Sequence, residues 1–340
     1  MLKKIKVEQA IGFTLGHDMT KVVPGECKVA AFRRGHIIKD EDIPELLSMG
    51  KEHIYVIEED EGEVHEEEAA CRLARAFAGP NLSFSGVKEG RIDIVSHASG
   101  LLRVNAVLLN EINRFEEIVI ATRHNNTVCQ PGMVVGGTKI IPLYIADATL
   151  RQVEELCHRR SELLRVLPFK LHKVGVVVTG SEVYKGRIKD KFVDVIEAKV
   201  KALGAHVHHQ TVVTDDEDMI AQAILNMKNV GCEIIFACGG LSVDPDDVTV
   251  EGVKRSGARI ISYGAPVMPG VMLLAGELNG IPIIGAPAAV IWNKATVVDL
   301  ILPRLIAGEK VSREDIVALG HGGLCLGCQP CTYPICPFCK

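Results

Sequence analysis

Aliphatic and β-branched runs alternate with amphipathic stripes through the second half of the chain. The runs predict buried strands at residues 174–178, 206–213, 233–237 and 259–262. Between them, apolar residues at helical spacing predict helices over residues 192–203 and 220–227, with Thr214 or Asp215 as the N-cap of the second. Because strands alternate with helices, we expect an α/β fold, a three-layer α/β/α sandwich around a mostly parallel sheet.

The most apolar stretch, residues 271–292, does not predict a membrane span. It is interrupted by Glu277, Pro282 and Pro287, and Asn279-Gly280 separates two apolar runs. Asn-Gly between apolar runs is typical of a two-residue hairpin turn, so we expect two buried strands here. A long helix over residues 288–306 is expected to complete the domain.

The first 168 residues carry shorter patterns, which predict a mixture of helices and strands. Asp42 as N-cap, Pro44 in the first turn and Gly50 at the end predict a helix over residues 42–49. The acidic run 58–68 is expected to be a solvated helix start or a mobile connection before the apolar positions of 69–77. Further patterns predict a helix face along 104–112, a strand at 118–121, turns at 131–132 and 136–137, and a polar helix over 147–164 that leads to a hinge at Pro168.

These patterns divide the chain into four regions. We expect an N-terminal α+β region at residues 1–78, a mixed α/β region with a linker helix at 79–168, the α/β domain at 169–310 and a cysteine-rich tail at 311–340. The hydrophobic fraction of 47% and the charged fraction of 24% are those of well-cored domains, so we expect no long disordered region.

Charge and composition exclude several classes of partner. The net charge is −5 and aromatic residues make up 4% of the chain, so neither bulk charge nor stacking surface favours nucleic acid. Lys3, Lys4 and Lys6 are not followed by the apolar segment that a signal peptide needs. We therefore expect a cytoplasmic protein with neither a membrane nor a nucleic acid as partner.

Two loops beyond predicted strands carry most of the candidate chemistry. Residues 179–182 (Thr-Gly-Ser-Glu) follow the first strand of the α/β domain, and residues 238–247 (Cys-Gly-Gly-Leu-Ser-Val-Asp-Pro-Asp-Asp) follow the third. Such loops face the ligand crevice of an open parallel sheet, where glycines let backbone N–H groups approach a phosphate and carboxylates hold Mg²⁺. The loops predict a phosphorylated small molecule as ligand, although the glycines would also suit a tight turn and Asp246 a helix N-cap.

In their order, these motifs resemble the molybdenum-cofactor biosynthesis domain that molybdopterin adenylyltransferases and molybdopterin molybdenumtransferases share. The resemblance covers roughly residues 172–306 and rests on residues 179–182, 186–190, 213–216, 239–242 and 246–247. It implies binding of molybdopterin, a phosphorylated pterin dithiolene, together with Mg²⁺ and an adenylyl group. A transferase is the activity that this family implies.

The resemblance also implies roles for individual residues. Asp247 aligns with a carboxylate that, in the family, organises the metal or activates the phosphate, and Asp244 is close to it in the sequence. These two are therefore the candidate catalytic residues. Glycine amides would hold the phosphate, and Asp215 and Asp216 would accept from the pterin edge. The candidate cofactor-binding residues are Thr179, Gly180, Ser181, Glu182, Asp215, Asp216, Gly239, Gly240, Leu241, Ser242, Pro269 and Gly270.

Departures from the family's pattern leave the reaction open. The loop that resembles its Lys-Pro-Gly-Lys-Pro motif is Met-Pro-Gly-Val-Met at 268–272, the Pro-Gly-Asn-Pro or Pro-Gly-Ser-Pro loop is Ala-Pro-Ala-Ala at 286–289, and the first 150 residues lack an Asp-Gly-Tyr-Ala sequence. A non-catalytic carrier or sensor of molybdopterin is therefore one alternative. A nucleotide pyrophosphatase acting on ADP-ribose is another, because Asp-Asp-Val-Thr at 246–249 after Gly-Gly-Leu also resembles the competence-damage-inducible proteins.

The tail carries a separate chemistry. Five of the eleven cysteines lie in the last sixteen residues, as Cys325-x2-Cys328-x2-Cys331-x4-Cys336-Pro-x-Cys339. Two-residue gaps let thiolates converge on one ion, and the spacing is similar to bacterial ferredoxin sequences with one extra residue before the fourth cysteine. We expect Zn or an iron–sulfur cluster, with residue 321, a histidine, as a further candidate ligand; a tail of unligated thiols is the alternative.

The expected partners follow from these assignments. The principal one is a small pterin or nucleotide ligand. Because related domains commonly assemble as dimers or trimers, we also expect a homo-oligomer. If the chain is a carrier, a molybdoenzyme is a further expected partner, docked through the tail.

Overall fold

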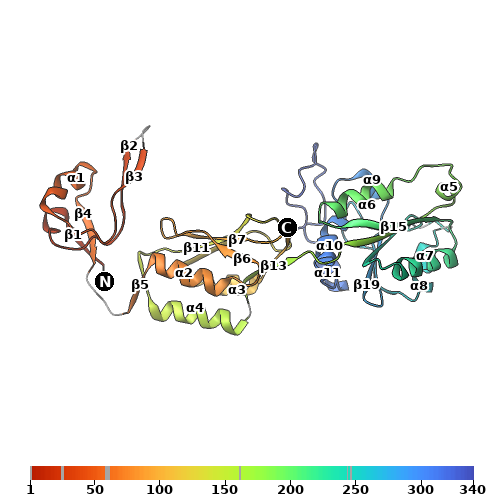
Figure 1. The fold of residues 1–340 in the computed structure, drawn as a ribbon, viewed down its shortest axis with the longest axis horizontal. Coiled ribbons are helices and arrows are strands. Elements are labelled where there is room, and N and C mark those ends of the chain that lie inside the picture. Colours follow the sequence, from red (N-terminus) through yellow and green to blue (C-terminus); the bar gives the residue numbers. More distant parts are fainter. Residues whose placement is uncertain (1, 24–26, 58–61, 161, 243, 246) are drawn as a thin grey trace.

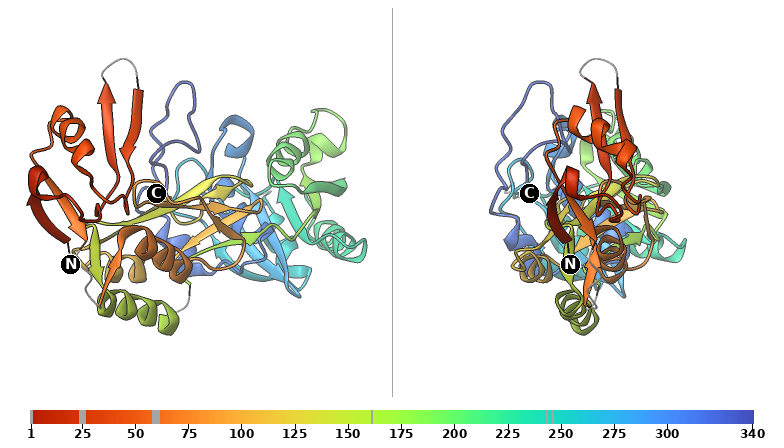
Figure 2. Two further views of the ribbon diagram at one scale, coloured as in Figure 1. Left: turned by 60° about the vertical axis from the view of Figure 1, so that its left-hand side comes forward. Right: turned by 90° about the vertical axis from the view of Figure 1, so that its left-hand side faces the viewer.

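The computed structural model describes residues 2–23, 27–57, 62–160, 162–242, 244–245 and 247–340. In these ranges the chain forms three units that follow one another along the longest axis of the molecule, each with a hydrophobic core of its own (Figure 1). The C-terminal tail lies against the third unit, as the views in Figure 2 also show. No helix of the described ranges is both long and apolar enough to span a bilayer.

The first unit is a small α+β structure built on two antiparallel strand pairs. β1 (Leu2–Lys6) pairs with β4 (His53–Ile57), and β2 (Met19–Val23) pairs with β3 (Cys27–Phe32). Its helical turns are η1 (Val7–Gln9), η2 (Asp40–Asp42) and α1 (Ile43–Ser48). The helix predicted at 42–49 is confirmed, because Pro44 lies in the first turn of α1 and Gly50 follows the helix with a φ of +73°.

The second unit combines helices with two antiparallel sheets and a strand pair. The sheets have the strand orders β6-β7-β11-β9 and β10-β8-β13, and β12 pairs with β5. The strands are β5 (Glu63–His65), β6 (Leu82–Phe84), β7 (Ile92–Ser96), β8 (Gly100–Val104), β9 (Ile118–Thr122), β10 (Val128–Cys129), β11 (Val134–Ile140), β12 (Tyr144–Ala146) and β13 (Leu164–Pro168). The helices are α2 (Glu66–Phe77), α3 (Ala106–Ile112) and α4 (Asp147–Arg160).

Hydrophobic packing assigns α2 to the second unit. Its buried residues Leu73 and Phe77 lie in one cluster with Leu150 and Val153 of α4. By its contacts this helix therefore belongs with residues 63–168, although the sequence pattern grouped it with residues 1–78. Of the acidic run 58–68, Glu66, Glu67 and Glu68 form the first turn of α2, where carboxylates also favour the helix dipole, whereas residues 58–61 lie outside the described residues.

Two local predictions for the second unit are wrong, while the strand at 118–121 is confirmed as β9. Gly136 and Gly137, expected in a turn, lie inside β11, beside a register shift at Val134 where a strand tolerates glycine. The polar helix expected over 147–164 ends at Arg160, and Leu164 begins a strand instead. That strand, β13, pairs with β8, so tertiary pairing overrides the local helical pattern.

The third unit is a three-layer α/β/α sandwich, as predicted. Its sheet has the order β15-β14-β16-β19-β18-β17; β15, β14, β16 and β19 run parallel, and β18 runs antiparallel to β19 and β17. The strands are β14 (Lys173–Thr179), β15 (His206–Val213), β16 (Ile234–Cys238), β17 (Arg259–Tyr263), β18 (Leu274–Leu278) and β19 (Ile281–Ala286). The helices are α5 (Ser181–Tyr184), α6 (Phe192–Lys201), α7 (Glu217–Asn229), α8 (Thr249–Arg255), α9 (Ala289–Trp292), α10 (Val297–Ile306) and α11 (Arg313–Ala318).

Alternating residues of the central strand divide the core of this unit into two halves. Val176 and Val178 of β14 pack in one cluster with residues of α6 and α10. Val177, which points to the opposite face, packs with residues of α7 and α8. Both faces of the sheet are therefore covered, which explains why the central strands consist almost entirely of aliphatic residues.

The predicted hairpin is confirmed, but the final helix is broken. Asn279 and Gly280 join β18 to β19 with φ angles of +51° and +88°, as a two-residue hairpin turn requires. The helix expected over 288–306 is instead α9 and α10, separated by residues 293–296. Thr296 starts α10 through a capping box with Asp299, so a strong internal N-cap divides the apolar run.

A chain of ion pairs crosses the junction between the second and third units. Arg103 of β8 lies 3.2 Å from Glu309, and Glu309 lies 3.0 Å from Arg304 of α10. Arg304 also pairs with Asp315 of α11 at 2.9 Å. Burial raises the pKa of Asp315, but hydrogen bonds from Arg304 and the N-cap Ser312 outweigh it and hold that pKa at about 2.

Candidate functional site

The two glycine-containing loops lie side by side at the carboxyl edge of the sheet. β14 and β16 are parallel neighbours, and Val178 near the end of β14 pairs with Cys238 at the end of β16. The loop of residues 179–182 therefore leaves the sheet next to the loop of residues 238–242. This is the edge at which open parallel sheets bind their ligands.

The approach of the two loops requires glycine in the second loop. Gly239 has a φ of +99°. A Cβ added to it would overlap the carbonyl oxygen of Thr179 and would lie 2.8 Å from the Thr179 hydroxyl. Gly240 has a φ of +55°, and its added Cβ would lie 2.6 Å from the hydroxyl of Thr249. Both glycines are thus fixed by close backbone approach, and both leave their amides unobstructed by a side chain.

Buried hydroxyl groups connect the same loops. The hydroxyls of Thr179 and Thr249 are 3.0 Å apart, and the Thr249 hydroxyl donates to the carbonyl oxygen of Gly239 at 2.9 Å. Thr249 is fully buried at the start of α8, and Thr179 is 4% exposed. Sequence reasoning gave Thr249 no role, because a single threonine three residues beyond Asp246 has no local signature; its position is set by the loop of the neighbouring strand.

The candidate catalytic acids lie on the second loop. Asp247 accepts a hydrogen bond from the backbone N–H of Ser242 at 2.6 Å, and its own N–H donates to the carbonyl oxygen of Asp244 at 3.0 Å. Tyr263, at the end of β17, donates its hydroxyl to the carbonyl oxygen of Leu241 at 3.0 Å. Burial, and then the charge of Asp247, raise the pKa of Tyr263, so this phenol faces the acid and stays protonated. Asp246 lies outside the described residues.

The two acids after β15 make local bonds. Asp215 accepts from the backbone N–H of Ser181 at 2.7 Å, and the hydroxyls of Ser181 and Thr214 are 2.8 Å apart. These contacts link the loop after β15 to the loop of residues 179–182. Asp216 is the N-cap of α7, where it accepts from the N–H of Met219 at 2.8 Å; the predicted N-cap, Thr214 or Asp215, was therefore wrong by one or two positions.

A further acid lies between the two loops and α6. Both carboxylate oxygens of Asp190 accept backbone N–H groups, from Phe192 at 2.9 Å and from Val193 at 3.0 Å. Its charge also contributes, after burial, to the raised pKa of the thiol of Cys238, so Asp190 lies near the end of β16. The sequence motif at 186–190 contained this residue, but sequence reasoning did not single it out.

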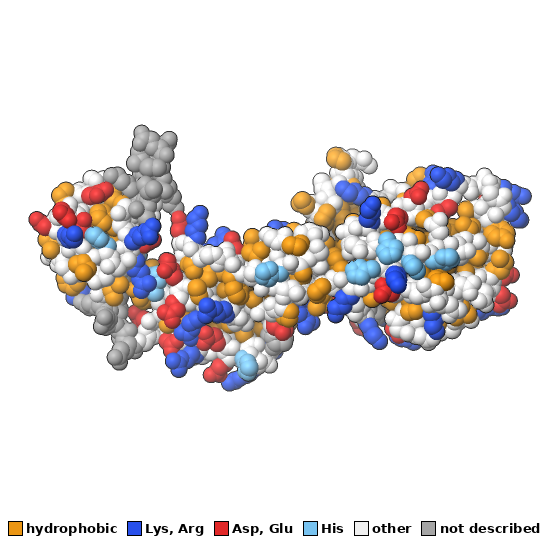
Figure 3. Space-filling model, in the orientation of Figure 1, with side chains coloured by type: hydrophobic (Ala, Val, Ile, Leu, Met, Phe, Trp, Pro, Cys, Tyr) orange, Lys and Arg blue, Asp and Glu red, His pale blue; other side chains and the backbone are white. Residues whose placement is uncertain are grey.

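Positive charge gathers beside the first loop. The segment of residues 185–191, between α5 and α6, exposes four cations, Lys185, Arg187, Lys189 and Lys191. Figure 3 shows lysine and arginine side chains at the end of the third unit where α5 lies. Lys191 lies 5.0 Å above the ring of Trp292, which fixes this end of the segment against α9. We call residues 185–191 the basic segment.

The loop of residues 268–272 is held by its neighbours in the fold. A Cβ added to Gly270 would lie 2.7 Å from the Val297 side chain, so this glycine packs against the start of α10. Met268 donates its N–H to the carbonyl oxygen of Gly323 and accepts from the N–H of Cys325, both at 2.8 Å. Pro269 and Gly270, predicted to bind the cofactor, thus lie where this loop joins α10 and the tail.

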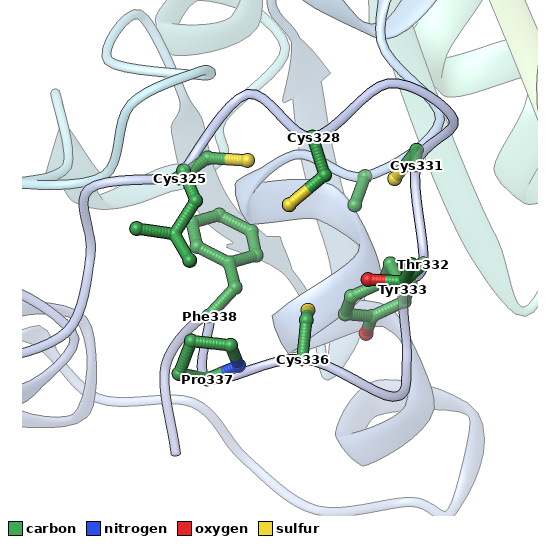
Figure 4. A pocket seen from close by; sticks show the side chains of 10 residues that line it. Cys325, Cys328, Cys331, Thr332, Tyr333, Cys336, Pro337 and Phe338 are labelled. Atoms are coloured by element: carbon green, nitrogen blue, oxygen red, sulfur yellow. The ribbon is translucent and has the colours of Figure 1, made fainter.

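Four tail cysteines share one pocket. Cys325, Cys328, Cys331 and Cys336 line it together with the largely apolar residues Ala295, Leu326, Thr332, Tyr333, Pro337 and Phe338 (Figure 4). Cys339 lies outside this lining, with its thiol 3.5 Å from the carbonyl oxygen of Leu319. Among the described residues, no three Cys, His, Asp or Glu side chains are gathered closely enough to hold a metal ion.

Two family matches agree with this division of the molecule. Residues 175–312 match the family described as a probable molybdopterin binding domain, and residues 4–58 match a domain of unknown function. The matched residues of the first family include both glycine loops, the basic segment and Asp247. The second match coincides with the first structural unit, which has its own core.

Individual relatives resemble parts of the chain. A CinA-like protein of Mycobacterium tuberculosis is 35% identical over 83 residues, which cover 24% of this chain and 19% of that protein. Among solved structures, CinA of Thermoplasma acidophilum is 21% identical, with a TM-score of 0.33 over 40% of this chain and 98% of that chain. The tungsten cofactor synthesizing protein MoaB of Pyrococcus furiosus is 19% identical, with a TM-score of 0.32 over 40% of this chain and 93% of that chain. Over residues 175–312 the chain is therefore similar to the family described as a probable molybdopterin binding domain.

Proposed function

We propose that the third unit binds molybdopterin at the carboxyl edge of its sheet, as a step of molybdenum cofactor biosynthesis. The observation that carries the proposal is the union of the two glycine loops through the Thr179–Thr249 hydroxyl pair, within the residues that match the molybdopterin-binding family. The union fixes Gly239 and Gly240 in conformations that only glycine adopts readily. A rigid group of backbone amides suits a phosphate, which is the anionic part of this ligand.

The residues around the loops fit a phosphorylated ligand with Mg²⁺. The amides of Gly180, Gly239 and Gly240 would hold the phosphate, and the basic segment would add positive charge at the rim. Asp247 and Asp244 would hold Mg²⁺, which commonly takes one or two carboxylates and completes its coordination with phosphate and water. The metal would neutralise phosphate charge.

Isothermal titration calorimetry of the full chain with molybdopterin, and with its adenylylated form, tests the proposal. We expect binding of at least one form that is tighter with Mg²⁺ than with chelator. Asp247→Asn should remove most of the Mg²⁺ dependence while leaving the far-UV circular dichroism unchanged. Failure of both forms to bind, with or without Mg²⁺, would overturn the proposal.

The basic segment provides a second test with a matched control. We expect Arg187→Ala combined with Lys189→Ala to weaken binding about tenfold at low salt, because each partly solvated cation contributes of the order of 0.5–1 kcal/mol. The control combines Lys201→Ala with Lys228→Ala, at the C-terminal ends of α6 and α7 and so at the opposite edge of the sheet. It removes the same charge and should bind as the wild type does. Equal loss in both variants would show that net charge, and not the segment, matters.

The same binding measurements separate an enzyme from a carrier. A transferase would convert adenylylated molybdopterin in the presence of molybdate and Mg²⁺, and Asp247→Asn would abolish this turnover. A carrier would bind without turnover. The loop at 268–272, which lacks both lysines of the family's motif, favours the carrier.

A nucleotide pyrophosphatase is the second candidate. It is favoured by the identity to a CinA-like protein and by Gly-Gly-Leu with Asp247-Val248-Thr249 in the matched part of the chain. Such an enzyme would hydrolyse ADP-ribose to AMP and ribose 5-phosphate with Mg²⁺. Release of AMP by the wild-type protein but not by Asp247→Asn would establish this activity in place of the first proposal if molybdopterin does not bind.

A further inference from the structure

The tail is a docked part of the third unit. After α11 it returns along the loop of residues 268–272, where the backbone of Met268 makes hydrogen bonds to Gly323 and Cys325. The end of the tail contacts its beginning, since the N–H of Cys339 donates to the carbonyl oxygen of Gly322 at 3.0 Å. Phe338 is 4% exposed within the core of the unit. The chain between residues 322 and 339 is therefore a closed loop fixed at both ends.

The spacing of the five cysteines allows two sets of four ligands. One set consists of two Cys-x2-Cys pairs, Cys325 with Cys328 and Cys336 with Cys339, which is typical of structural zinc. The other set uses the first three cysteines and Cys336. Their spacing is similar to the bacterial ferredoxin run, in which the cysteine before the proline ligates the second cluster where two are present. The two sets differ in one member: the first contains Cys339, and the second contains Cys331.

The structure brings together the second set. Cys325, Cys328, Cys331 and Cys336 line one pocket, and Figure 4 shows them placed around it on successive turns of the tail. Cys339 packs outside this lining, where its thiol contacts the carbonyl oxygen of Leu319 and its N–H bonds Gly322. Cys331 lies inside the ring and Cys339 outside it, so the geometry distinguishes the two sets.

The cysteine lining and the apolar walls of the pocket favour a cluster over a single ion. Four thiolates around one tetrahedral zinc lie about 3.8 Å from one another, given a Zn–S bond of about 2.3 Å. The described residues contain no such tight group, although four thiols face the same space. A cube of four irons and four sulfides is larger than one ion and holds its ligands farther apart. The largely apolar walls, which include Leu326, Pro337 and Phe338, suit such a cluster, whose potential depends on burial and on the hydrophobic shell.

We propose that the tail binds a [4Fe–4S] cluster through Cys325, Cys328, Cys331 and Cys336, and that Cys339 is a packing residue outside the ligand set. This inference is independent of the ligand of the strand-end site. The pocket lies beside the start of α10, since Ala295 lines it and the hydroxyl of Tyr333 donates to the carbonyl oxygen of Asp299 at 3.2 Å.

Anaerobic purification of the full chain, followed by reconstitution with iron and sulfide, tests the assignment. We expect about four irons and about four acid-labile sulfides per chain, broad visible absorption, and a paramagnetic signal after reduction with dithionite. Cys331→Ser should lose most of the iron and sulfide, whereas Cys339→Ser should keep them. Cys71→Ser, on α2 of the second unit, is the control for handling of thiols and should behave as the wild type does.

Each other result overturns the proposal. One zinc per chain, retained in Cys331→Ser and lost in Cys339→Ser, would establish the two-pair zinc site. Neither iron nor zinc in the purified and the reconstituted protein would show that the tail is held by its hydrogen bonds and packing alone. Circular dichroism of the apo variants distinguishes loss of the cluster from loss of the fold, because the third unit has a core that does not depend on the pocket.

Discussion

Substitution of Gly239 by alanine tests the joined loops most directly. Gly239 follows β16 with a φ of +99°, and its new methyl group would overlap the carbonyl oxygen of Thr179 and lie 2.8 Å from the Thr179 hydroxyl. Thr179 is 4% exposed and belongs to the central strand of the sheet, so it cannot move aside without disturbing the core. One of the two loops must therefore shift.

The expected loss of unfolding free energy in Gly239→Ala has two parts. Placing an L-residue at a positive φ costs about 1–2 kcal/mol, and forcing a methyl group into a packed site costs about 1–3 kcal/mol, so we expect a loss of about 3 kcal/mol of unfolding free energy. Gly231 is the matched control, because it has a φ of +83° in the same unit and a Cβ there would meet no atom within 4 Å. Gly231→Ala should lose only about 1 kcal/mol, the conformational part.

Urea unfolding followed by the fluorescence of Trp292 measures both variants. It is the single tryptophan of the chain and lies on α9, so the signal reports on the third unit even where the three units unfold separately. With a slope of about 2 kcal/mol per molar urea, the midpoint should fall by about 1.5 M in Gly239→Ala and by about 0.5 M in Gly231→Ala. Equal shifts in the two variants would refute the close approach of the loops as the reason for glycine at 239.

Two further substitutions address the hydroxyl bridge and the ion pairs. Thr249→Val removes the hydroxyl that contacts Thr179 and Gly239, and we expect a loss of about 1–2 kcal/mol in urea unfolding, most of it restored in Thr249→Ser. For Asp315, burial raises the pKa, but Arg304 helps to hold it at about 2, below its ordinary 3.8. A lowered carboxyl pKa stabilises the fold above about pH 4 and loses that effect as the pH falls toward 2. Since the Asp315 side chain is 34% exposed, we expect Asp315→Asn to lose about 1–2 kcal/mol at pH 7 and to flatten the acid unfolding profile; an unchanged profile would exclude this pair as its source.

The architecture of the third unit could be predicted because its elements carry strong local signals. A central strand covered on both faces must be apolar at nearly every position, and Asn279-Gly280 supplies the two positive φ angles of its hairpin turn. The break between α9 and α10 was missed for a related reason. The run from 288 to 306 is mostly apolar, and the capping box of Thr296 with Asp299 is visible only once the helix start is known.

Tertiary pairing explains the errors in the second unit. The sequence pattern extended the helix α4 as far as Leu164. The backbone of β13 instead pairs with β8, and Leu164 lies opposite Val104, 60 positions earlier in the chain. Similarly, the glycines of β11 look like turn residues until the register shift beside them is known. In both cases a partner distant in sequence decides the conformation, and no local pattern contains that information.

In the candidate site, too, contacts between residues that are distant in sequence could not be predicted for single side chains. The sequence placed the glycine loops correctly at adjacent strand ends, because strand order follows from the fold class. It predicted that Asp215 and Asp216 bind a ligand, which stays a prediction, but it did not foresee that Asp215 accepts from Ser181 and that Asp216 caps α7. Carboxylates after a strand satisfy nearby backbone N–H groups first, since these donors are fixed and close.

The loop at 268–272 and the tail belong to one structural arrangement. The N–H and carbonyl groups of Met268 both bond to the tail, while Gly270 packs on α10, so this loop is held from two sides by elements that come after it in the sequence. The two positions that resemble the family's lysines are Met268 and Val271, whose side chains are 56% and 41% exposed and carry no charge. Positive charge lies instead in the basic segment beside the first glycine loop, where four cations are exposed. The tail contacts this loop through the backbone of Met268, so it holds the loop in place without taking up the side-chain positions where the family's motif has lysines.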